Sequence, residues 1–578
     1  MNPLPAAPGP GSWALDAAHC ERPHSHFLIG LGFDRIYTEG LRASAERYGL
    51  LIDTIEARFV DGFLYTCPRP IGAPPGAAPP PRWLLWLLCR LHPGLRARVA
   101  RAEQVMATRC WRADVDDFRD RHAAAMRERC LQFSRTDLRA RDDAGLIAEL
   151  DAVARVAADD LFDHFRLSGA CMLPVGDFLA HAAAWTGCAP AEALALLTGA
   201  SPDSVDAIDA LQAAARAVCA DADACAILAT DAPAGDRLAA LRTREATGPA
   251  VEAWLSLVGE RIVTGHDVAE LRAIELPGAL IDSLRVCVAA AAAPDAAAAP
   301  RAAAGVDAAH DALRARVPPD ARDRFDALLA DARAAHPLRD ARSVFDFWCM
   351  GLLRRVILEV GQRLAARGQL DAADHAVDCT QAELASLLLH RTGPEAAVVA
   401  ERVGRRLGRS CADMPDVLGP PPAPPPAPEW LPSAAGRISR AFGVYLEASF
   451  QERQPSAPHH APATPAPGPR AGPAIEGIAA SPGIARGPAR LVHSPADFAR
   501  VQEGDVLVAR ITTPAYNVLL PLLAAVVTER GGVLSHPAIV SREFGLPAVV
   551  GARGALDALP EGAVIEVDGH TGAVWVLP

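Results

Sequence analysis

The stretch VVTERGGVLSHPAIVSREFGLPAVVG, from Val526 to Gly551, contains one histidine among residues suited to phosphate chemistry. A neutral imidazole is nucleophilic near neutral pH because its ordinary pKa is about 6.5. The glycine pair before His536 and the proline after it predict that the ring stands at the start of a helix. Unpaired N–H groups and the positive end of a helix dipole favour an anion there. The pattern therefore predicts covalent phosphoryl carriage on His536.

Neighbouring side chains could support a phosphoryl group on this ring. Ser535 and Thr528 offer hydroxyl donors, and Arg542 could reach back toward phosphate oxygens. The glycines Gly531 and Gly532 leave room for a phosphate-bearing substrate to approach the backbone. A lone histidine before a helix is more often a cap or a surface residue, so these residues alone leave a structural role open.

The elements that must position this histidine can be predicted from the same stretch. The apolar run from Leu522 ends at Val527, as a buried strand would. The following helix is expected over residues 537–544, with Gly545 and then Pro547 as its stop signals. His536 is accordingly expected to be the N-cap residue of a helix of about two turns.

The whole chain of 578 residues is too long for one compact core. Residues 1–452 are expected to form a mainly helical region, with a short β element near 57–66 and proline-rich breaks at 69–82 and 419–430. A proline-rich linker follows at 453–474. Valine-rich runs and glycine turns predict an α/β domain over 475–578. The fold class is thus multidomain, with a large helical N-terminal region and a C-terminal α/β domain.

Composition limits the classes of function. The net charge is −12 and no long basic run occurs, which argues against a nucleic-acid partner. Thirteen cysteines without a metal-ligand spacing indicate reduced thiols and no metal site. The segment WLLWLLCRL (83–91) is too short to span a membrane, so a buried helix is expected there. We expect a soluble cytoplasmic protein without a membrane or nucleic-acid partner.

The histidine stretch closely resembles the phosphohistidine (swivelling) domain of phosphoenolpyruvate-utilising enzymes, which include phosphoenolpyruvate synthase, pyruvate phosphate dikinase and the rifampin phosphotransferases. The resemblance spans about 100 residues and includes the upstream segments GIAASPGIARGPARLV and TTPAYNVLLPLLAAVVTE. Pro537 and Ser541 depart from the pattern without affecting the carrier role, and Leu534 replaces a regulatory threonine of the dikinases. The matching positions are Thr528, Gly531, Gly532, Ser535, His536, Ala538, Ile539, Arg542, Glu543, Gly545, Pro547, Ala548, Val549, Val550 and Gly551.

The resemblance implies that an ATP-grasp domain charges the histidine, that the domain swings, and that an acceptor then receives the phosphoryl group. No stretch of this chain resembles an ATP-grasp domain or a Walker-type glycine loop. We therefore expect a separate ATP-grasp chain that binds Mg-ATP, with no tightly bound cofactor here. The acceptor is expected to be a small molecule, as in phosphoenolpyruvate synthase-like or antibiotic phosphotransferase-like enzymes. The alternative is a catalytically inactive binding or regulatory protein derived from this family.

The helical region more faintly resembles the substrate-binding part of the same enzymes. The resemblance is carried by segments such as SWALDAAHCERPHSHFL, ERIVTGHDVAELRAIELP and LLRRVILEVGQRLAARGQLD. For every polar residue in them, a structural role is the stronger interpretation; Arg355 and Glu359, for example, fit an i,i+4 ion pair. The candidate acceptor-pocket residues are His164, Arg261, Arg355 and Glu359, followed by His266, Asp267 and Arg354.

Overall fold

The computed structural model describes residues 5–577, apart from 18–20, 200–202, 264, 293–305, 451–472, 494, 513–515 and 517–518. The predicted linker at 453–474 lies outside the described residues except for its last two positions. The chain forms two compact units, each assembled from three segments. The first comprises Met1–Asp177, Ser256–Ala273 and Ala330–Phe442, and the second comprises Phe178–Leu255, Ile274–Leu329 and Gly443–Pro578.

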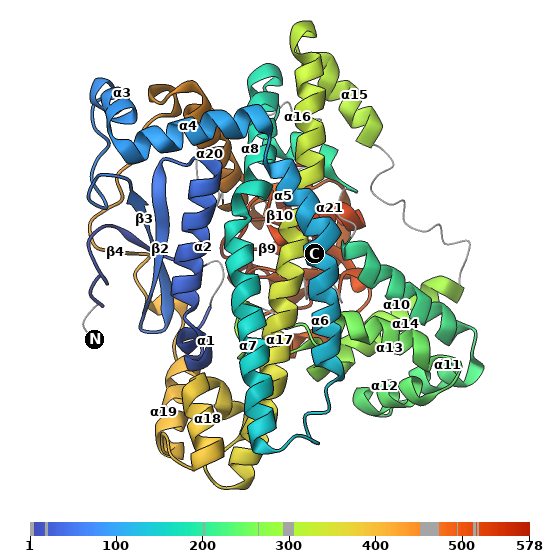
Figure 1. The fold of residues 1–578 in the computed structure, drawn as a ribbon. Coiled ribbons are helices and arrows are strands. Elements are labelled where there is room, and N and C mark those ends of the chain that lie inside the picture. Colours follow the sequence, from blue (N-terminus) through green and yellow to red (C-terminus); the bar gives the residue numbers. More distant parts are fainter. Residues whose placement is uncertain are drawn as a thin grey trace. The chain divides into compact units, whose positions relative to one another are not determined.

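Two long helices, α7 (Asp143–Arg166) and α17 (Pro337–Ala366), run side by side through the first unit (Figure 1). Apolar residues of α7 recur every three or four positions and are buried, as an amphipathic helix requires. The unit also contains α1 (His26–Leu31), α2 (Phe33–Tyr48), α3 (Arg82–Leu91), α4 (Pro93–Thr108), α5 (Trp111–Asp117), a π-helical turn η1 (Phe118–His122), α6 (Ala123–Arg135), η5 (Ala373–Asp378), α18 (Gln381–His390) and α19 (Ala396–Leu407).

A small sheet in the first unit has the strand order β2-β3-β1-β4. Its strands β2 (Ile52–Val60) and β3 (Phe63–Pro70) form the β element that the sequence predicted. Asp61 and Gly62 both have positive φ, as an Asp-Gly hairpin turn requires. The strand β1 (Trp13–Leu15) pairs with β3 and with the short edge strand β4 (Val417–Leu418).

One helical stretch of the described residues, Asp143–Thr186, is long and apolar enough to cross a membrane. It comprises α7 and α8 (Ser168–Thr186), and 72% of its most apolar window is buried inside the protein. Because most of this window is buried, the apolar composition of α7 and α8 is explained by their packing in the core.

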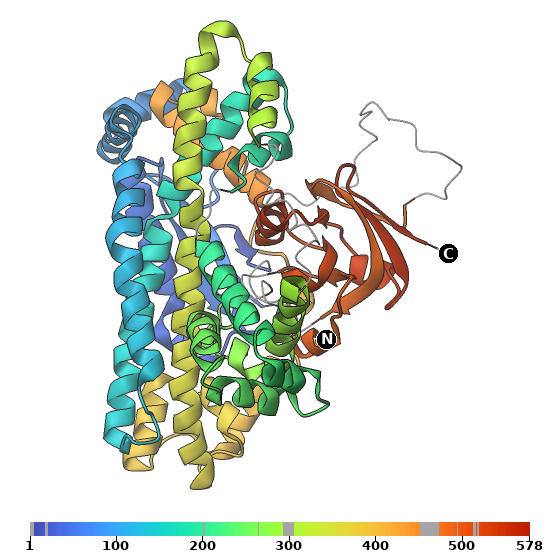
Figure 2. The same ribbon diagram turned by 90° about the vertical axis from the view of Figure 1, so that its right-hand side faces the viewer.

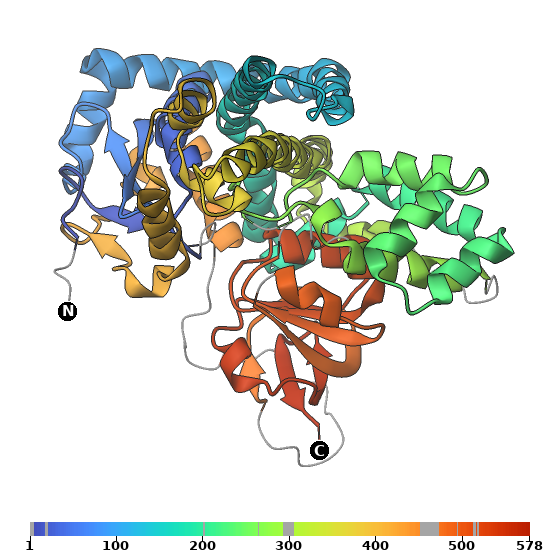
Figure 3. The same ribbon diagram turned by 90° about the horizontal axis from the view of Figure 1, so that it is seen from below.

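The second unit combines a helical group with the C-terminal sheet. Helices α10 to α14 pack on one another and form the green group in Figure 3. The helical elements are α9 (Pro190–Leu194), η2 (Ala195–Leu197), α10 (Asp203–Cys219), α11 (Ala222–Ala229), α12 (Ala234–Thr243), α13 (Gly248–Val258), α14 (Pro277–Ala292), α15 (Val306–Arg316), α16 (Arg322–Ala335) and the end of α20 (Ser433–Phe450).

The C-terminal sheet has the order β5-β12-β11-β7-β8-β9-β10-β6 and is seen edge-on in Figure 2. Strands β7 to β10 are parallel, and β8 and β9 are almost wholly buried, as valine-rich parallel strands usually are. The predicted fold class is confirmed. The strands are β5 (Ile475–Glu476), β6 (Ile478–Ser481), β7 (Ile484–Val492), β8 (Asp505–Ala509), β9 (Leu523–Thr528), β10 (Ala548–Val550), β11 (Val564–Asp568) and β12 (Ala573–Val576).

Candidate active site

His536 lies at the carboxyl end of β9, on the first turn of α21 (His536–Phe544). The carboxyl ends of parallel strands are where α/β sheets usually bind ligands. The helix ends at Gly545, whose φ of 67° gives the expected left-handed cap. The N-cap prediction was wrong by one residue: Ser535 has the extended cap conformation, and His536 is the first helical residue. The imidazole still lies at the positive end of the helix dipole.

The loop before His536 requires both of its glycines. Gly531 has a φ of 107°, and a Cβ there would lie 2.6 Å from Ser535 Oγ. A Cβ on Gly532 would lie 2.3 Å from the carbonyl oxygen of Ala448 in the last turn of α20. The sequence predicted that these glycines leave space for a substrate. In this structure the space beside Gly532 is occupied by α20.

Helix α20 is joined to this loop by two backbone hydrogen bonds. The N–H of Gly532 donates to the carbonyl oxygen of Ser449, and the N–H of Leu534 donates to that of Ala448, both at 3.0 Å. These bonds satisfy two backbone donors of the loop that precedes the N-cap Ser535. The histidine loop is therefore held on two sides, by β9 and by α20.

The imidazole of His536 contacts the hydroxyl group of Thr512. Its Nδ1 lies 3.1 Å from Oγ1 of Thr512, which is buried. The residue is partly buried, and its Nε2 atom has no contact with solvent. Sequence reasoning missed Thr512, which lies three residues beyond β8. The signal was available in principle, because residues that follow two neighbouring parallel strands meet at the same sheet edge.

The predicted supporting residues hold the loop backbone. Thr528 Oγ1 donates to the carbonyl oxygen of Arg530 at 2.9 Å, and Ser535 Oγ donates to that of Gly532 at 2.7 Å. Arg542 is buried, and its guanidinium donates to the carbonyl oxygens of Ala480 and Val533 at 2.8 and 2.9 Å. In this structure the side chain of Arg542 fixes the loop, and its predicted reach toward phosphate oxygens stays a prediction.

Glu543 of the same motif contacts the helical part of the second unit. Both of its carboxylate oxygens lie 3.0 Å from the backbone nitrogen of Gly199, which follows η2. This bond and the bonds to α20 fasten both ends of the α21 region. Within the second unit, these contacts hold the C-terminal domain in one docked position.

His164, the first acceptor-pocket candidate, belongs to a buried chain of acids and histidines in the first unit. Its Nδ1 lies 2.5 Å from Oδ2 of Asp346 on α17, which is 1% exposed. Burial raises the pKa of Asp346 to about 8 against the charge of Arg342, and burial likewise raises that of Asp160 to about 7. His122 of the π-helical turn lies 3.6 Å from Asp160. Asp346 was not among the predicted residues.

The remaining acceptor candidates make structural contacts. Arg261 lies over the ring of Trp348, 5.1 Å from its centroid, and Arg355 donates to the carbonyl oxygens of Phe133 and Thr136. The predicted pairing of Arg355 with Glu359 is wrong. Glu359 accepts from Arg363 at 3.1 Å, whereas Arg355 lies 3.8 Å from Glu260.

The other three candidates, His266, Asp267 and Arg354, each contact a different part of the protein. His266 packs on Phe347 with ring centroids 5.0 Å apart, and Arg354 donates to the carbonyl oxygen of Val268 at 3.1 Å. Asp267 accepts from the N–H of Ser25 at 2.7 Å and contacts His24 at 3.2 Å. Although burial opposes ionisation, the contact with His24 and these bonds lower the pKa of Asp267 to about 2.

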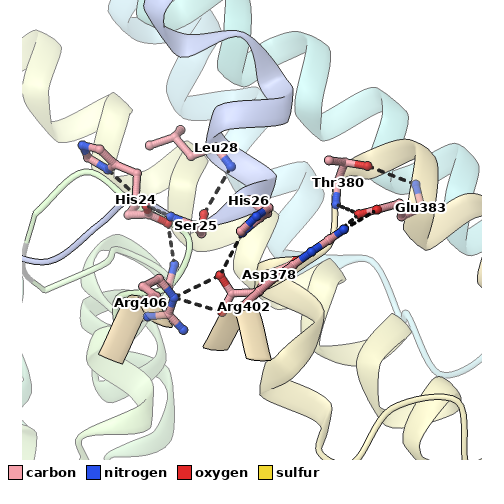
Figure 4. A network of polar contacts seen from close by, with 11 residues as sticks. His24, Ser25, His26, Leu28, Asp378, Thr380, Glu383, Arg402 and Arg406 are labelled. Carbon is pink, nitrogen blue, oxygen red and sulfur yellow. Dashed lines mark hydrogen bonds and ion pairs between the residues drawn. The ribbon is translucent and has the colours of Figure 1, made fainter. Parts of the chain in front are cut away.

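A neighbouring network, shown in Figure 4, was also missed by sequence reasoning. His26, the first residue of α1, lies 3.6 Å from the fully buried carboxylate of Asp378. Arg406 donates to both oxygens of that carboxylate, and Arg402 pairs with Glu383. Among the described residues, no group of three or more His, Cys, Asp and Glu side chains could hold a metal ion.

Two segments of the chain match known protein families. Residues 501–572 match the PEP-utilising enzyme, mobile domain. This match covers strands β8 to β11 of the C-terminal sheet, and we call the predicted domain at 475–578 the mobile domain. Residues 171–340 match the rifampicin phosphotransferase fourth domain, which covers the helical part of the second unit. His536 thus lies in the segment that carries the phosphoenolpyruvate-utilising signature, in agreement with the resemblance of the sequence.

Curated relatives match parts of this chain. The uncharacterized phosphotransferase YvkC of Bacillus subtilis is 46% identical over 103 residues, which are 18% of this chain and 12% of that protein. A probable phosphoenolpyruvate synthase of Archaeoglobus fulgidus is 46% identical over 101 residues, 18% of this chain and 13% of that protein. The uncharacterized protein Rv2047c of Mycobacterium tuberculosis is 32% identical over 249 residues, 42% of this chain and 24% of that protein. In these three proteins the matched part is at most about a quarter of their length.

Proposed function

We propose that this chain is the carrier and acceptor-binding component of a phosphotransferase. His536 receives a phosphoryl group from a separate ATP-grasp chain charged with Mg-ATP. It then passes the group to a small molecule bound by the helical region, as in phosphoenolpyruvate synthase-like or antibiotic phosphotransferase-like enzymes. The observation that carries the proposal is the contact of His536 Nδ1 with Thr512 at the start of α21.

This contact bears on which nitrogen reacts, because either Nδ1 or the hydroxyl group of Thr512 can be the donor. We assign the tautomer in which Nδ1–H donates to Thr512 Oγ1, since it leaves the lone pair on Nε2 for attack. The lone pair of Nε2 attacks phosphorus, and the bond from phosphorus to the nucleotide oxygen breaks. In the second step an acceptor oxygen attacks phosphorus, its proton leaves to a base, and the P–N bond breaks. Because Nε2 has no solvent contact here, both steps require a rearrangement around the ring.

The proposal is tested by charging the full chain in two ways. Phosphoramidate serves as a direct phosphoryl donor, and ATP with magnesium and recombinant ATP-grasp chains serves as the enzymatic one. We expect acid-labile, base-stable phosphate on His536, mapped by mass spectrometry under alkaline conditions. His536→Ala removes the signal, whereas His493→Ala, an exposed histidine of the same domain, retains it. Failure of both donors in the wild-type chain contradicts the carrier role.

The alternative is a catalytically inactive binding or regulatory protein derived from this family. The observation that favours it is the enclosure of Nε2 together with the two backbone bonds from α20 to the histidine loop. Under this alternative the loop stays fastened, and His536 does not exchange with a phosphoryl donor. The charging experiment separates the two, since only the carrier acquires phosphate.

A further inference from the structure

The segment that the sequence predicted as a buried helix is exposed along one face. In α3 the side chains of Trp83, Trp86, Leu87 and Leu91 are 68, 47, 37 and 67% exposed. We call these four residues the tryptophan face. The spacing of three or four residues places them on one side of the helix. Leu85 and Cys89 are buried on the other side. The prediction of a buried helix therefore holds for that side of α3 and is wrong for the tryptophan face.

The tryptophan face is a contiguous apolar surface. Arg82, Trp83, Trp86 and Leu87 line a hollow of about 560 Å³. Soluble proteins usually scatter their exposed apolar residues singly, and a patch of large side chains marks a binding surface. This helix also contains two tryptophans, although aromatic residues make up only 5% of the chain.

The segment that carries the tryptophan face is basic, in contrast to the acidic chain. Residues 82–102 contain five arginines and no acidic residue, although the whole chain has a net charge of −12. Arg98 is buried and lies 3.6 Å from Glu46, whereas the other four arginines are exposed. The guanidinium of Arg90 lies 3.6 Å from the Trp86 ring centroid. The neighbouring η7 (Pro428–Trp430) contributes Glu429, which pairs with Arg440.

We propose that the tryptophan face, with Arg82 and Arg90 beside it, binds peripherally to an anionic lipid bilayer. Tryptophan favours the boundary between headgroups and acyl chains, where the ring is apolar and its N–H remains hydrated. The arginines contact lipid phosphates while their stems lie along apolar surface. The inference departs from the expectation that no membrane is a partner, because the helix would lie on a bilayer without spanning it.

A second copy of the chain fits this face less well. A symmetric contact through α3 would bring the exposed Arg82 and Arg90 of two copies together, and like charges across an interface are unfavourable. A bilayer of acidic lipids supplies an apolar layer and negative charge at once. The inference does not depend on phosphoryl transfer, because it rests only on the first unit.

Flotation of the full chain with vesicles tests the inference. The vesicles contain phosphatidylcholine alone or equal parts of phosphatidylcholine and phosphatidylglycerol. We expect binding only to the anionic vesicles, weakened by added salt. Trp83→Ser with Trp86→Ser reduces binding about tenfold or more because the inserted rings are lost. Arg82→Gln with Arg90→Gln also weakens binding. The matched control, Leu389→Ser with Leu407→Ser, removes exposed leucines of α18 and α19 and leaves binding unchanged.

Three results would overturn the inference. The first is absence of the wild-type chain from the anionic vesicle fraction at low salt. The second is equal binding of the wild type and the double tryptophan variant. The third is self-association in analytical ultracentrifugation that the tryptophan variant loses while neither protein floats, which would assign the face to a second copy. Circular dichroism of each variant confirms that the substitutions leave the fold intact.

Discussion

His536 of the second unit and His164 of the first lie in opposite electrostatic surroundings. His536 begins a helix, and its Nδ1 contacts a neutral hydroxyl group of Thr512. His164 lies in the last turn of α7, and its Nδ1 contacts the carboxyl group of Asp346. The positive end of a helix disfavours an imidazolium ion, whereas the negative end stabilises one. The first environment suits a nucleophile, whereas the second places an imidazole against a buried acid whose pKa is raised by burial.

The difference shows why a histidine alone says little about chemistry. Both rings are partly enclosed by the protein, and both have an oxygen partner at Nδ1. Only the partner and the end of the helix distinguish them. Substitutions in both units test this contrast.

Substitution of Thr512 removes the partner that fixes the ring of His536. In Thr512→Val we expect the rate of charging by phosphoramidate to fall by about ten- to a hundredfold, because the ring loses its tautomer and orientation. The rate is measured by alkaline mass spectrometry at several times. Thr571→Val, at an exposed position of the same domain, keeps the wild-type rate. An unchanged rate in Thr512→Val would show that the contact has no role in charging.

Substitution of Arg542 removes the support beneath the histidine loop. Arg542→Met leaves the carbonyl oxygens of Ala480 and Val533 without their charged donor. We expect the free energy of unfolding of the mobile domain to fall by about 2–4 kcal/mol. Urea denaturation measures this loss, and Arg553→Met at an exposed position serves as the control. If Arg542 instead bound phosphate, charging would fail while stability stayed at the wild-type value.

The buried acids near His164 predict a pH dependence of stability. The folded pKa of Asp346, about 8, is raised by burial above its ordinary value of about 3.9, so its contribution is fully present below that lower value. It is lost as the pH rises toward 8, and Asp160, with a raised pKa of about 7, acts in the same direction. Urea midpoints of the wild type should therefore fall between about pH 4 and pH 8.

In Asp346→Asn this decline should become shallower, because one of the two titrating acids is replaced by a neutral side chain. The comparison uses the difference in midpoint across the pH range, which cancels any uniform loss of stability. An identical slope in the variant and the wild type would contradict the assignment of Asp346 as a protonated buried acid.

Glu543 provides the smallest expected effect. Glu543→Gln weakens a charge-assisted bond to the N–H of Gly199 that lies at the protein surface. We expect a loss of about 1 kcal/mol or less in global stability. Hydrogen exchange of the Gly199 amide should nevertheless become faster, as the docked position opens more often. Unaltered exchange would mean that Glu543 does not fasten the mobile domain.

The local pattern of sequence predicted much of the mobile domain. The strand before His536, the helix of about two turns and the glycine cap at Gly545 follow from residues that are adjacent in sequence. The helical region likewise follows from apolar spacing, as in α7. These features depend on neighbours within one or two turns, and the short-range rules for strands, helices and caps therefore suffice.

Features set by tertiary contacts could not be predicted in this way. Thr512 reaches His536 only because β8 and β9 are neighbours in the sheet. The exposed side of α3 has a periodicity that a buried helix shares, so the pattern does not tell which face is covered. Asp346 carried a usable signal: a lone acid within the apolar run FDFWCM requires a buried partner, although the sequence does not name it.

The most direct measurement of the central claim is the identity of the phosphorylated nitrogen in the charged full-length chain. Nitrogen and phosphorus NMR of protein with labelled histidine, charged with phosphoramidate, distinguishes Nε2 from Nδ1. The account predicts one phosphohistidine, with phosphate on Nε2 of His536, that disappears in His536→Ala. Phosphate on Nδ1 of His536, or on another histidine, would contradict it.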